Sequence, residues 1–203
     1  MPTAIHAISS DTPPEPTPNR IRWTRRQVDF LVKNGLLTGR YELIDGEVIS
    51  KTGQNPPHRV CVVLVTGWLI RVFGERHVTC QSTMEIAVND RETNEPEPDV
   101  YVTVEPVTAY THRHPGPGEI LLVVEIANTT VRFDLRKKAP LYARAGMPEY
   151  WVVDIIGRRI VAHRQPGPEG YAEILEFRDD EEISPVARPD ASVRIAELLP
   201  PVS

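Results

Sequence analysis

The stretch from Leu121 to Asp154, LLVVEIANTTVRFDLRKKAPLYARAGMPEYWVVD, decides the fold of this chain. It begins with four consecutive aliphatic residues, a pattern typical of a strand buried on both faces, and Glu125 follows directly. A charged segment with helical periodicity comes next, and a second apolar run covers Tyr150 to Asp154. The order of strand, helix and strand predicts a βαβ unit with reactive groups at its mouth, and therefore an α/β fold.

Length and composition predict one buried domain. The chain has 203 residues, is 40% hydrophobic and 25% charged, and carries a formal net charge of −5. Residues 1–19 are rich in proline, so we expect a disordered or loosely docked arm, followed by a single domain over residues 20–203. No apolar run approaches the roughly 20 residues that span a bilayer. We expect a cytoplasmic protein with no membrane contact, in which Cys61 and Cys80 are buried packing residues.

Two helices and a hairpin are predicted before the deciding stretch. Thr24 and Gln27 form a capping box for a short helix that ends near Gly35. The segment Tyr41–Ser50, YELIDGEVIS, predicts a tight hairpin because Asp45 and Gly46 suit its turn. Pro57 and His58 then open a long apolar helix that ends at Gly74.

Short strands are predicted on both sides of the deciding stretch. Val78–Val88 is interpreted as a strand pair or one bent strand, and Asp99–Val104 as a further strand. Arg159–Arg164 and Tyr171–Phe177 alternate as a hairpin, and Val193–Leu199 is a short helix or strand.

Two carboxylates stand where predicted strands meet polar segments. Asp99 begins one strand and Glu125 ends another, so they converge if the two strands are neighbours. A carboxylate pair in a cleft suits a hard cation such as Mg²⁺ or Mn²⁺. Equally well, by sequence alone, Asp99 initiates a turn and Glu125 pairs with a nearby arginine.

Helical geometry distinguishes the lysines that follow Glu125. At about 100° per residue, Lys138 falls within the apolar stripe, whereas Lys137 and Arg144 fall on the opposite side. An inward lysine is unusual unless it meets an anion, and Glu125 or a bound phosphate would supply one. Pro140 requires either that the regular helix starts near Lys137 or that the helix is kinked.

Four blocks of the sequence resemble a known family. EPDVYV at Glu97–Val102, LLVVEIANTT at Leu121–Thr130 and FDLRKKAPLYARAGMPEYWVVD at Phe133–Asp154 are similar to blocks of the Uma-two family, described as restriction endonucleases. RYELIDGEV at Arg40–Val48 is similar as well, and the match covers roughly residues 23–171. The resemblance implies a restriction-endonuclease-like core of the PD-(D/E)-x-K type, with a mixed central sheet flanked by helices. The N-terminal helix and hairpin would be additions to that core.

The resemblance also implies site residues. Asp99, Glu125 and the backbone carbonyl of Ile126 would hold the metal. The usual lysine position, two residues after the glutamate, is Ala127 here, so the ordinary motif is broken. The family takes its lysine from the following helix, and the matching position is Lys138.

Three further residues receive ranked interpretations. Glu42, in the matching N-terminal block, is a candidate additional acid, and a surface strand residue is an equally good interpretation. Tyr142 is expected to be a packing residue, and Asp134 is expected to cap the helix.

The function that the resemblance implies is Mg²⁺- or Mn²⁺-dependent hydrolysis of DNA by an endonuclease, with catalysis by Asp99, Glu125 and Lys138. A homodimer is expected, because cutting both strands commonly uses two active sites. Two alternatives remain open: a catalytically inactive nuclease-fold binding or accessory protein, and a hydrolase of smaller phosphate esters.

Overall fold

A six-stranded mixed sheet forms the centre of the computed structural model, which describes residues 21–51 and 55–201. The strand order is β3-β4-β5-β6-β7-β8, and only β5 and β6 are parallel to each other. The parallel pair is the βαβ unit that the deciding stretch predicted, and the restriction-endonuclease-like fold class is confirmed. The predicted arm of residues 1–19 lies outside the described residues.

The central strands are β3 (Val78–Cys80), β4 (Val100–Thr103), β5 (Ile120–Ala127), β6 (Glu149–Asp154), β7 (Arg159–Gly167) and β8 (Gly170–Arg178). Two small antiparallel pairs lie outside this sheet, β1 (Tyr41–Ile44) with β2 (Glu47–Ser50) and β9 (Glu182–Ile183) with β10 (Val193–Arg194). The helices are α1 (Arg25–Lys33), α2 (Pro56–Phe73), α3 (Val131–Phe133), α4 (Ala139–Arg144) and α5 (Ile195–Leu198). Single 3-10 turns cover Glu75–His77, Val107–Tyr110 and Pro117–Glu119.

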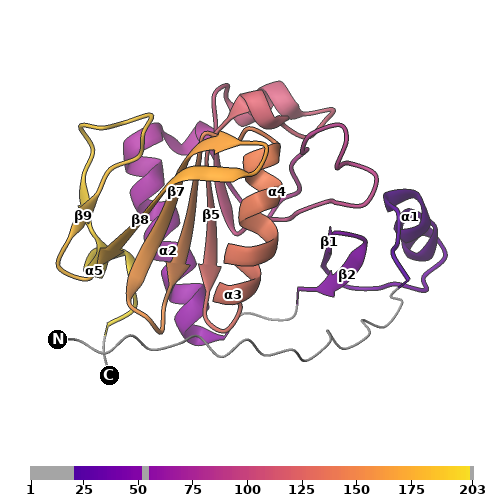
Figure 1. Ribbon diagram of the computed structural model, residues 1–203, viewed down its shortest axis with the longest axis horizontal. Helices are drawn as coiled ribbons and strands as arrows, with labels where there is room; N and C mark the ends of the chain where they lie inside the picture. The colour runs from indigo at the N-terminus through magenta and orange to yellow at the C-terminus, as the bar shows by residue number, and fades with distance from the viewer. Residues whose placement is uncertain (1–20, 52–54, 202–203) are drawn as a thin grey trace, which may run out of the picture.

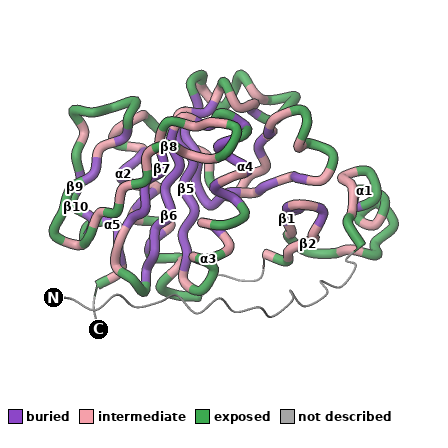
Figure 2. The backbone as a smooth tube through the Cα atoms, viewed as in Figure 1, coloured by how far each residue is buried: buried purple, intermediate pink, exposed green. Residues whose placement is uncertain are grey.

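Alternate residues of β5 face two different layers. Leu122, Val124 and Ile126 belong to a core shared with α2 and α5, whereas Val123 and Ala127 belong to a second core shared with α4. The sheet therefore lies between α2 with α5 on one face and α4 on the other (Figure 1), and its strands form the buried centre of the molecule (Figure 2). Because side chains alternate along a strand, Glu125 is directed to the α4 face.

The connection from β5 to β6 contains a π-helical segment, Asp134–Lys138, between α3 and α4. Its wider turn is closed by a hydrogen bond from the Ala139 amide to the Asp134 carbonyl. Regular α-helix resumes at Ala139, so Pro140 lies in a first turn, where its missing N–H costs little. Of the two alternatives that the sequence left open for Pro140, the structure has the first, a helix whose first turn contains the proline, but it begins at Ala139 and follows a π-helical segment that was not predicted.

The β1–β2 hairpin lies to the right of α3 and α4 in Figure 1, and α1 lies beyond the hairpin at the far right. The hairpin turns at Asp45 and Gly46, both with positive φ, as predicted. The predicted capping box of α1 is also present, with reciprocal bonds between Thr24 and Gln27.

The prediction of strand over Val78–Val88 is wrong beyond Cys80. Gln81 adopts a φ of +50°, which a strand cannot continue, and the following residues form no strand. Pro96 and Pro98 on the adjacent segment lack the N–H groups that a ladder would need. Met84 and Ile86 are nevertheless fully buried, so the segment packs as irregular chain.

The two cysteines differ from the expectation that both are buried. Cys61 is buried, but Cys80 is exposed because it lies on the three-residue edge strand β3. Within residues 21–51 and 55–201, no helix is long and apolar enough to cross a membrane.

Candidate functional site

Asp99 and Glu125 lie opposite each other at adjacent strand ends. β4 and β5 are antiparallel with Val100 opposite Val124, and one further step of that register places Asp99 opposite Glu125. The Ile126 amide donates to Oδ2 of Asp99 at 2.9 Å, which ties the first carboxylate to the end of β5. The predicted convergence of the two strands is therefore present, and both side chains are buried, with Asp99 4% and Glu125 2% exposed.

Lys138 reaches Glu125 from the helical connection. Its Nζ lies 2.8 Å from Oε1 of Glu125 and 2.8 Å from Oε2 of Glu42, and the residue is 2% exposed. The prediction that Lys138 turns inward is confirmed. Lys137 points outward to Asp45, with 3.0 Å between Nζ and Oδ2.

The carboxylates around Lys138 come from three elements. Glu42 on β1 is buried, contrary to its interpretation as a surface strand residue, and its carboxylate forms an ion pair with Lys138. Asp134 lies 3.8 Å from the same Nζ and accepts a hydrogen bond from the Thr130 hydroxyl. The expectation that Asp134 caps the start of a regular helix is wrong, because Asp134 lies inside the π-helical segment.

Tyr142 also contributes to the polar cluster. Its hydroxyl donates to Oε1 of Glu125 at 3.0 Å, and its ring packs edge-on against Tyr150 with centroids 4.9 Å apart. The packing role that the sequence predicted is thus accompanied by a direct bond to the carboxylate. Glu125 accepts from a lysine and a tyrosine rather than from an arginine, the partner considered from sequence.

Sequence reasoning missed His58 and Lys51. His58 lies in the first turn of α2, and its Nε2 is 3.3 Å from Oδ2 of Asp99. Lys51 donates from Nζ to the Glu97 carbonyl at 2.9 Å and exerts an electrostatic effect on Asp99. In the sequence, His58 was marked only as part of the opening of a helix, and nothing placed that helix start near Asp99.

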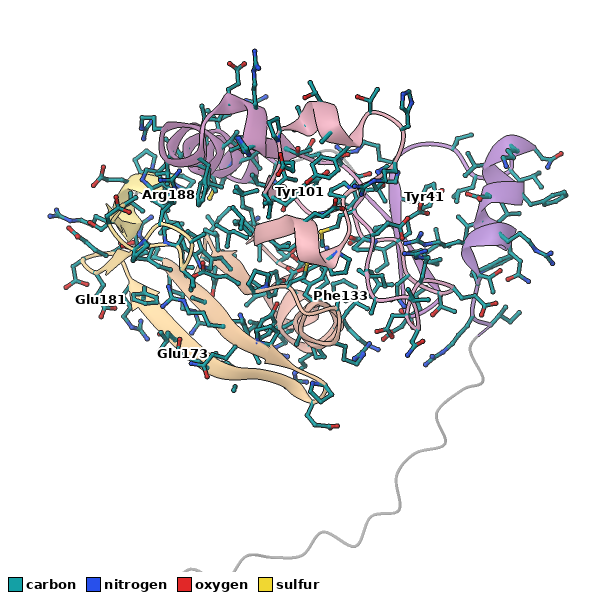
Figure 3. All side chains as sticks on the ribbon, turned by 90° about the horizontal axis from the view of Figure 1, so that it is seen from above. Tyr41, Tyr101, Phe133, Glu173, Glu181 and Arg188 are labelled. Carbon is teal, nitrogen blue, oxygen red and sulfur yellow. The ribbon has the colours of Figure 1, made fainter. Side chains whose placement is uncertain are left out.

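A cavity of about 700 Å³ opens over these groups. One side is formed by β1, β2 and the start of α2, and the other by the turn after β5 and by α3, where Phe133 is labelled in Figure 3. Five carboxylates and four cationic side chains line it: Glu42, Glu47, Asp99, Glu125 and Asp134, with Arg40, Lys51, Arg132 and Lys138. The volume lies within the range of ligand pockets, about 300–1,000 Å³.

Burial and neighbouring charges shift the pKa values of the three central groups. Burial would raise the pKa of Asp99, but the His58 hydrogen bond, Lys51 and the Ile126 amide together lower it. Burial raises the pKa of Glu125 to about 8, against the lowering effect of Lys138. Burial would lower the pKa of Lys138, but Glu125 and the other two carboxylates raise it. Asp99 is therefore held as a carboxylate and Lys138 as an ammonium group.

The donor atoms at the Asp99 end of the cavity suit a hard divalent cation. Among the described residues, Oδ1 of Asp99 and Oε2 of Glu125 accept no hydrogen bond, while the other oxygen of each is occupied. Burial raises the pKa of Glu125 although Lys138 and Lys51 oppose this effect, and a bound cation would add further positive charge that favours the carboxylate. In the part of the chain that the structure describes, no three His, Cys, Asp or Glu residues group as metal ligands.

Comparisons with known proteins agree with this architecture. No curated protein matches the chain. The crystal structure of a "putative nuclease belonging to DUF820" from Anabaena variabilis ATCC 29413 has a TM-score of 0.64 at 14% sequence identity, covering 83% of this chain and 96% of that one, which supports the fold. The model of the Uma2 family, described as "Putative restriction endonuclease", matches residues 37–196 and supports a nuclease-like function. By this match over most of its length, the chain belongs to the Uma2 family.

Proposed function

We propose that this protein is a divalent-metal-dependent endonuclease that hydrolyses phosphodiester bonds in DNA. The observation that carries the proposal is the convergence of three groups from separate elements in one cavity: Asp99 before β4, Glu125 on β5 and Lys138 from the π-helical segment. A buried lysine held 2.8 Å from a buried carboxylate, beside a second carboxylate, combines oxygen ligands for a divalent metal with a cation that can stabilise charge on a phosphate.

Asp99, Glu125 and the carbonyl of Ile126 would hold Mg²⁺ or Mn²⁺. The carboxylates supply hard oxygen ligands of the kind that both ions prefer. When bound, the metal would polarise the phosphate and lower the pKa of a bound water. Hydrogen bonds to the second oxygen of each carboxylate fix the orientation of both side chains.

Lys138 acts as a hydrogen-bond donor and electrostatic group. Its raised pKa, caused by three surrounding carboxylates, makes it a poor acceptor of a proton from water. Its ammonium group can instead orient the attacking water and stabilise negative charge that develops on the phosphate. Glu42 contributes a second ion pair that holds this ammonium group in place.

The charge of the cavity suits a phosphate substrate best when a cation is present. Its four cationic side chains are matched by the other carboxylates of the lining even when Glu125 is protonated, so the lining offers a phosphate no excess of positive charge. Arg132 on α3 is exposed at the wall and can contact phosphates that flank the scissile bond. A divalent metal therefore links substrate binding to catalysis at this site.

Plasmid nicking tests the proposal. Purified protein is incubated with supercoiled plasmid and Mg²⁺ or Mn²⁺, with EDTA as the metal-free control. We expect metal-dependent nicking that the Asp99→Ala, Glu125→Ala double variant lacks. Equal nicking by wild type and double variant would reject the proposal, and cleavage of nucleotide esters without nicking would assign the site to smaller substrates.

A further inference from the structure

His58 is fixed in place by the start of α2. The side chain of Asn55 caps this helix and accepts from the His58 amide at 3.0 Å, while Pro56 and Pro57 occupy the first two helical positions. The prolines restrict the backbone before His58, because their rings fix φ. The ring lines the cavity and has a side-chain exposure of 17%, so its direction is set by a rigid backbone and by packing.

The ring of His58 meets Asp99 on one oxygen only. Oδ2 of Asp99 is approached by His58 Nε2 at 3.3 Å and by the Ile126 amide at 2.9 Å. Two donors from different elements, a helix and a strand, prevent the carboxylate from rotating. Oδ1 is left without a hydrogen bond from any described residue and can serve as a ligand.

The other ring nitrogen supports a defined tautomer. Nδ1 of His58 is buried and has no hydrogen-bond partner among the described residues. The Asp99 carboxylate can only accept hydrogen bonds, so Nε2 must carry a proton to bond with it, and the neutral ring then keeps its lone pair on Nδ1. The proton therefore belongs on Nε2, where Asp99 accepts it.

We propose that His58 is a positioning residue that orients Asp99 so that Oδ1 faces a divalent cation. This inference rests on the proposed function, and it assigns His58 an action through Asp99 rather than a contact with metal or substrate. Groups that orient a metal ligand in this way typically change metal affinity about 10–100-fold when removed. The lowered pKa of Asp99, to which His58 contributes, agrees with the assignment.

Two amide substitutions separate this role from general packing. In His58→Gln the side-chain amide nitrogen can occupy the place of Nε2 and donate to Asp99, whereas in His58→Asn the amide is too short. For the full chain, Mn²⁺ affinity is measured by calorimetry and plasmid nicking by kcat and KM. We expect His58→Asn to weaken Mn²⁺ binding about 10-fold or more and to lower kcat with little change in KM for plasmid, and His58→Gln to stay within about 3-fold of wild type.

The outcomes distinguish this inference from the proposed function. Wild type that binds Mn²⁺ no better than Asp99→Asn would overturn both. Carboxylate-dependent Mn²⁺ binding that His58→Asn leaves unchanged, or that His58→Gln weakens equally, would overturn the role of His58 alone. If His58→Asn fails to fold, ¹⁵N NMR of the wild-type ring decides, since a proton on Nδ1 instead of Nε2 contradicts the assignment.

Discussion

Two neighbouring strands each carry a fully buried glutamate, and the two glutamates differ in what surrounds them. Glu149 begins β6 and Glu125 lies near the end of β5, the strand parallel to it. Glu149 is 0% exposed and accepts from the Trp151 indole at 2.9 Å, from Arg164 Nε at 2.8 Å and from the Val186 amide at 2.7 Å. Both of its oxygens are therefore occupied by the protein.

Glu125 is bound on one oxygen only. Lys138 and Tyr142 both donate to Oε1 of Glu125. Glu125 lines the cavity, whereas Glu149 is not among the residues that line it. Burial alone thus does not mark a reactive carboxylate. The distinguishing features are an oxygen without a protein donor and access to a cavity, which leave Glu125 able to bind a cation while Glu149 ties β6 to β7 and the segment after β9.

The largest effect is expected from removing the lysine. Lys138→Met leaves Glu125 and Glu42 buried without their cation, which should lower the free energy of unfolding by about 3–5 kcal/mol. Urea denaturation measures the loss, and nicking should disappear. The matched control is Lys137→Met, whose ion pair with Asp45 is exposed, so its effect should stay below about 1 kcal/mol with nicking retained. Equal losses of unfolding free energy and of nicking in the two variants would contradict the assignment of Lys138 to a buried ion-pair cluster.

Replacing the cavity glutamate should impair catalysis more than folding. Glu125→Gln keeps the shape but removes a metal ligand, and we expect nicking to fall at least about 100-fold, equivalent to about 2.7 kcal/mol. The loss of unfolding free energy should be below about 2 kcal/mol, because burial already disfavours the ionised form and raises the pKa of Glu125. Parallel nicking and urea-unfolding measurements on one preparation separate the two effects.

Glu149→Gln should show the opposite behaviour. The charged bond to Arg164 becomes weaker, and one oxygen is exchanged for an amide that cannot accept from the Val186 amide or from Trp151. We expect a loss of about 2 kcal/mol in unfolding free energy and an unchanged nicking rate at temperatures where the variant is folded. A fall in nicking comparable to that of Glu125→Gln would show that burial, rather than cavity access, distinguishes the pair.

Much of this architecture follows from local sequence pattern. The apolar run of β5, the periodicity that turns Lys138 inward and the turn at Asp45 are encoded by neighbouring residues, so they could be predicted. Convergence of Asp99 with Glu125 could be predicted only conditionally, because strand pairing is not local.

The features that sequence reasoning missed depend on tertiary placement. His58 meets Asp99 because the start of α2 lies beside the start of β4, and no local pattern reports that arrangement. The burial of Glu42 likewise depends on how the hairpin packs near Lys138. The π-helical segment and the positive φ of Gln81 were not indicated by any local sequence pattern either.

The smallest effect concerns His163, which lies next to the Glu149 cluster on β7. The imidazole is buried between Tyr150 and Tyr171, with ring centroids at 5.3 Å and 5.6 Å, and burial lowers its pKa below the ordinary 6.5. Below pH 6.5 the unfolded chain therefore binds a proton that the folded chain resists, so stability falls as the pH falls. His163→Phe removes this group. Between pH 7.5 and 5.5, wild type should therefore lose about 1 kcal/mol more unfolding free energy than the variant.

Urea denaturation of wild type and His163→Phe at each pH measures this difference, and the titration of Glu125 is common to both proteins. A wild-type curve that loses no more stability than the variant would place the acid sensitivity elsewhere. A steeper loss in wild type would mean that mild acid weakens the α4 face of the sheet, where His163 packs against Tyr150, through a histidine that does not line the cavity. Stability and catalysis would then respond to pH through groups on different strands.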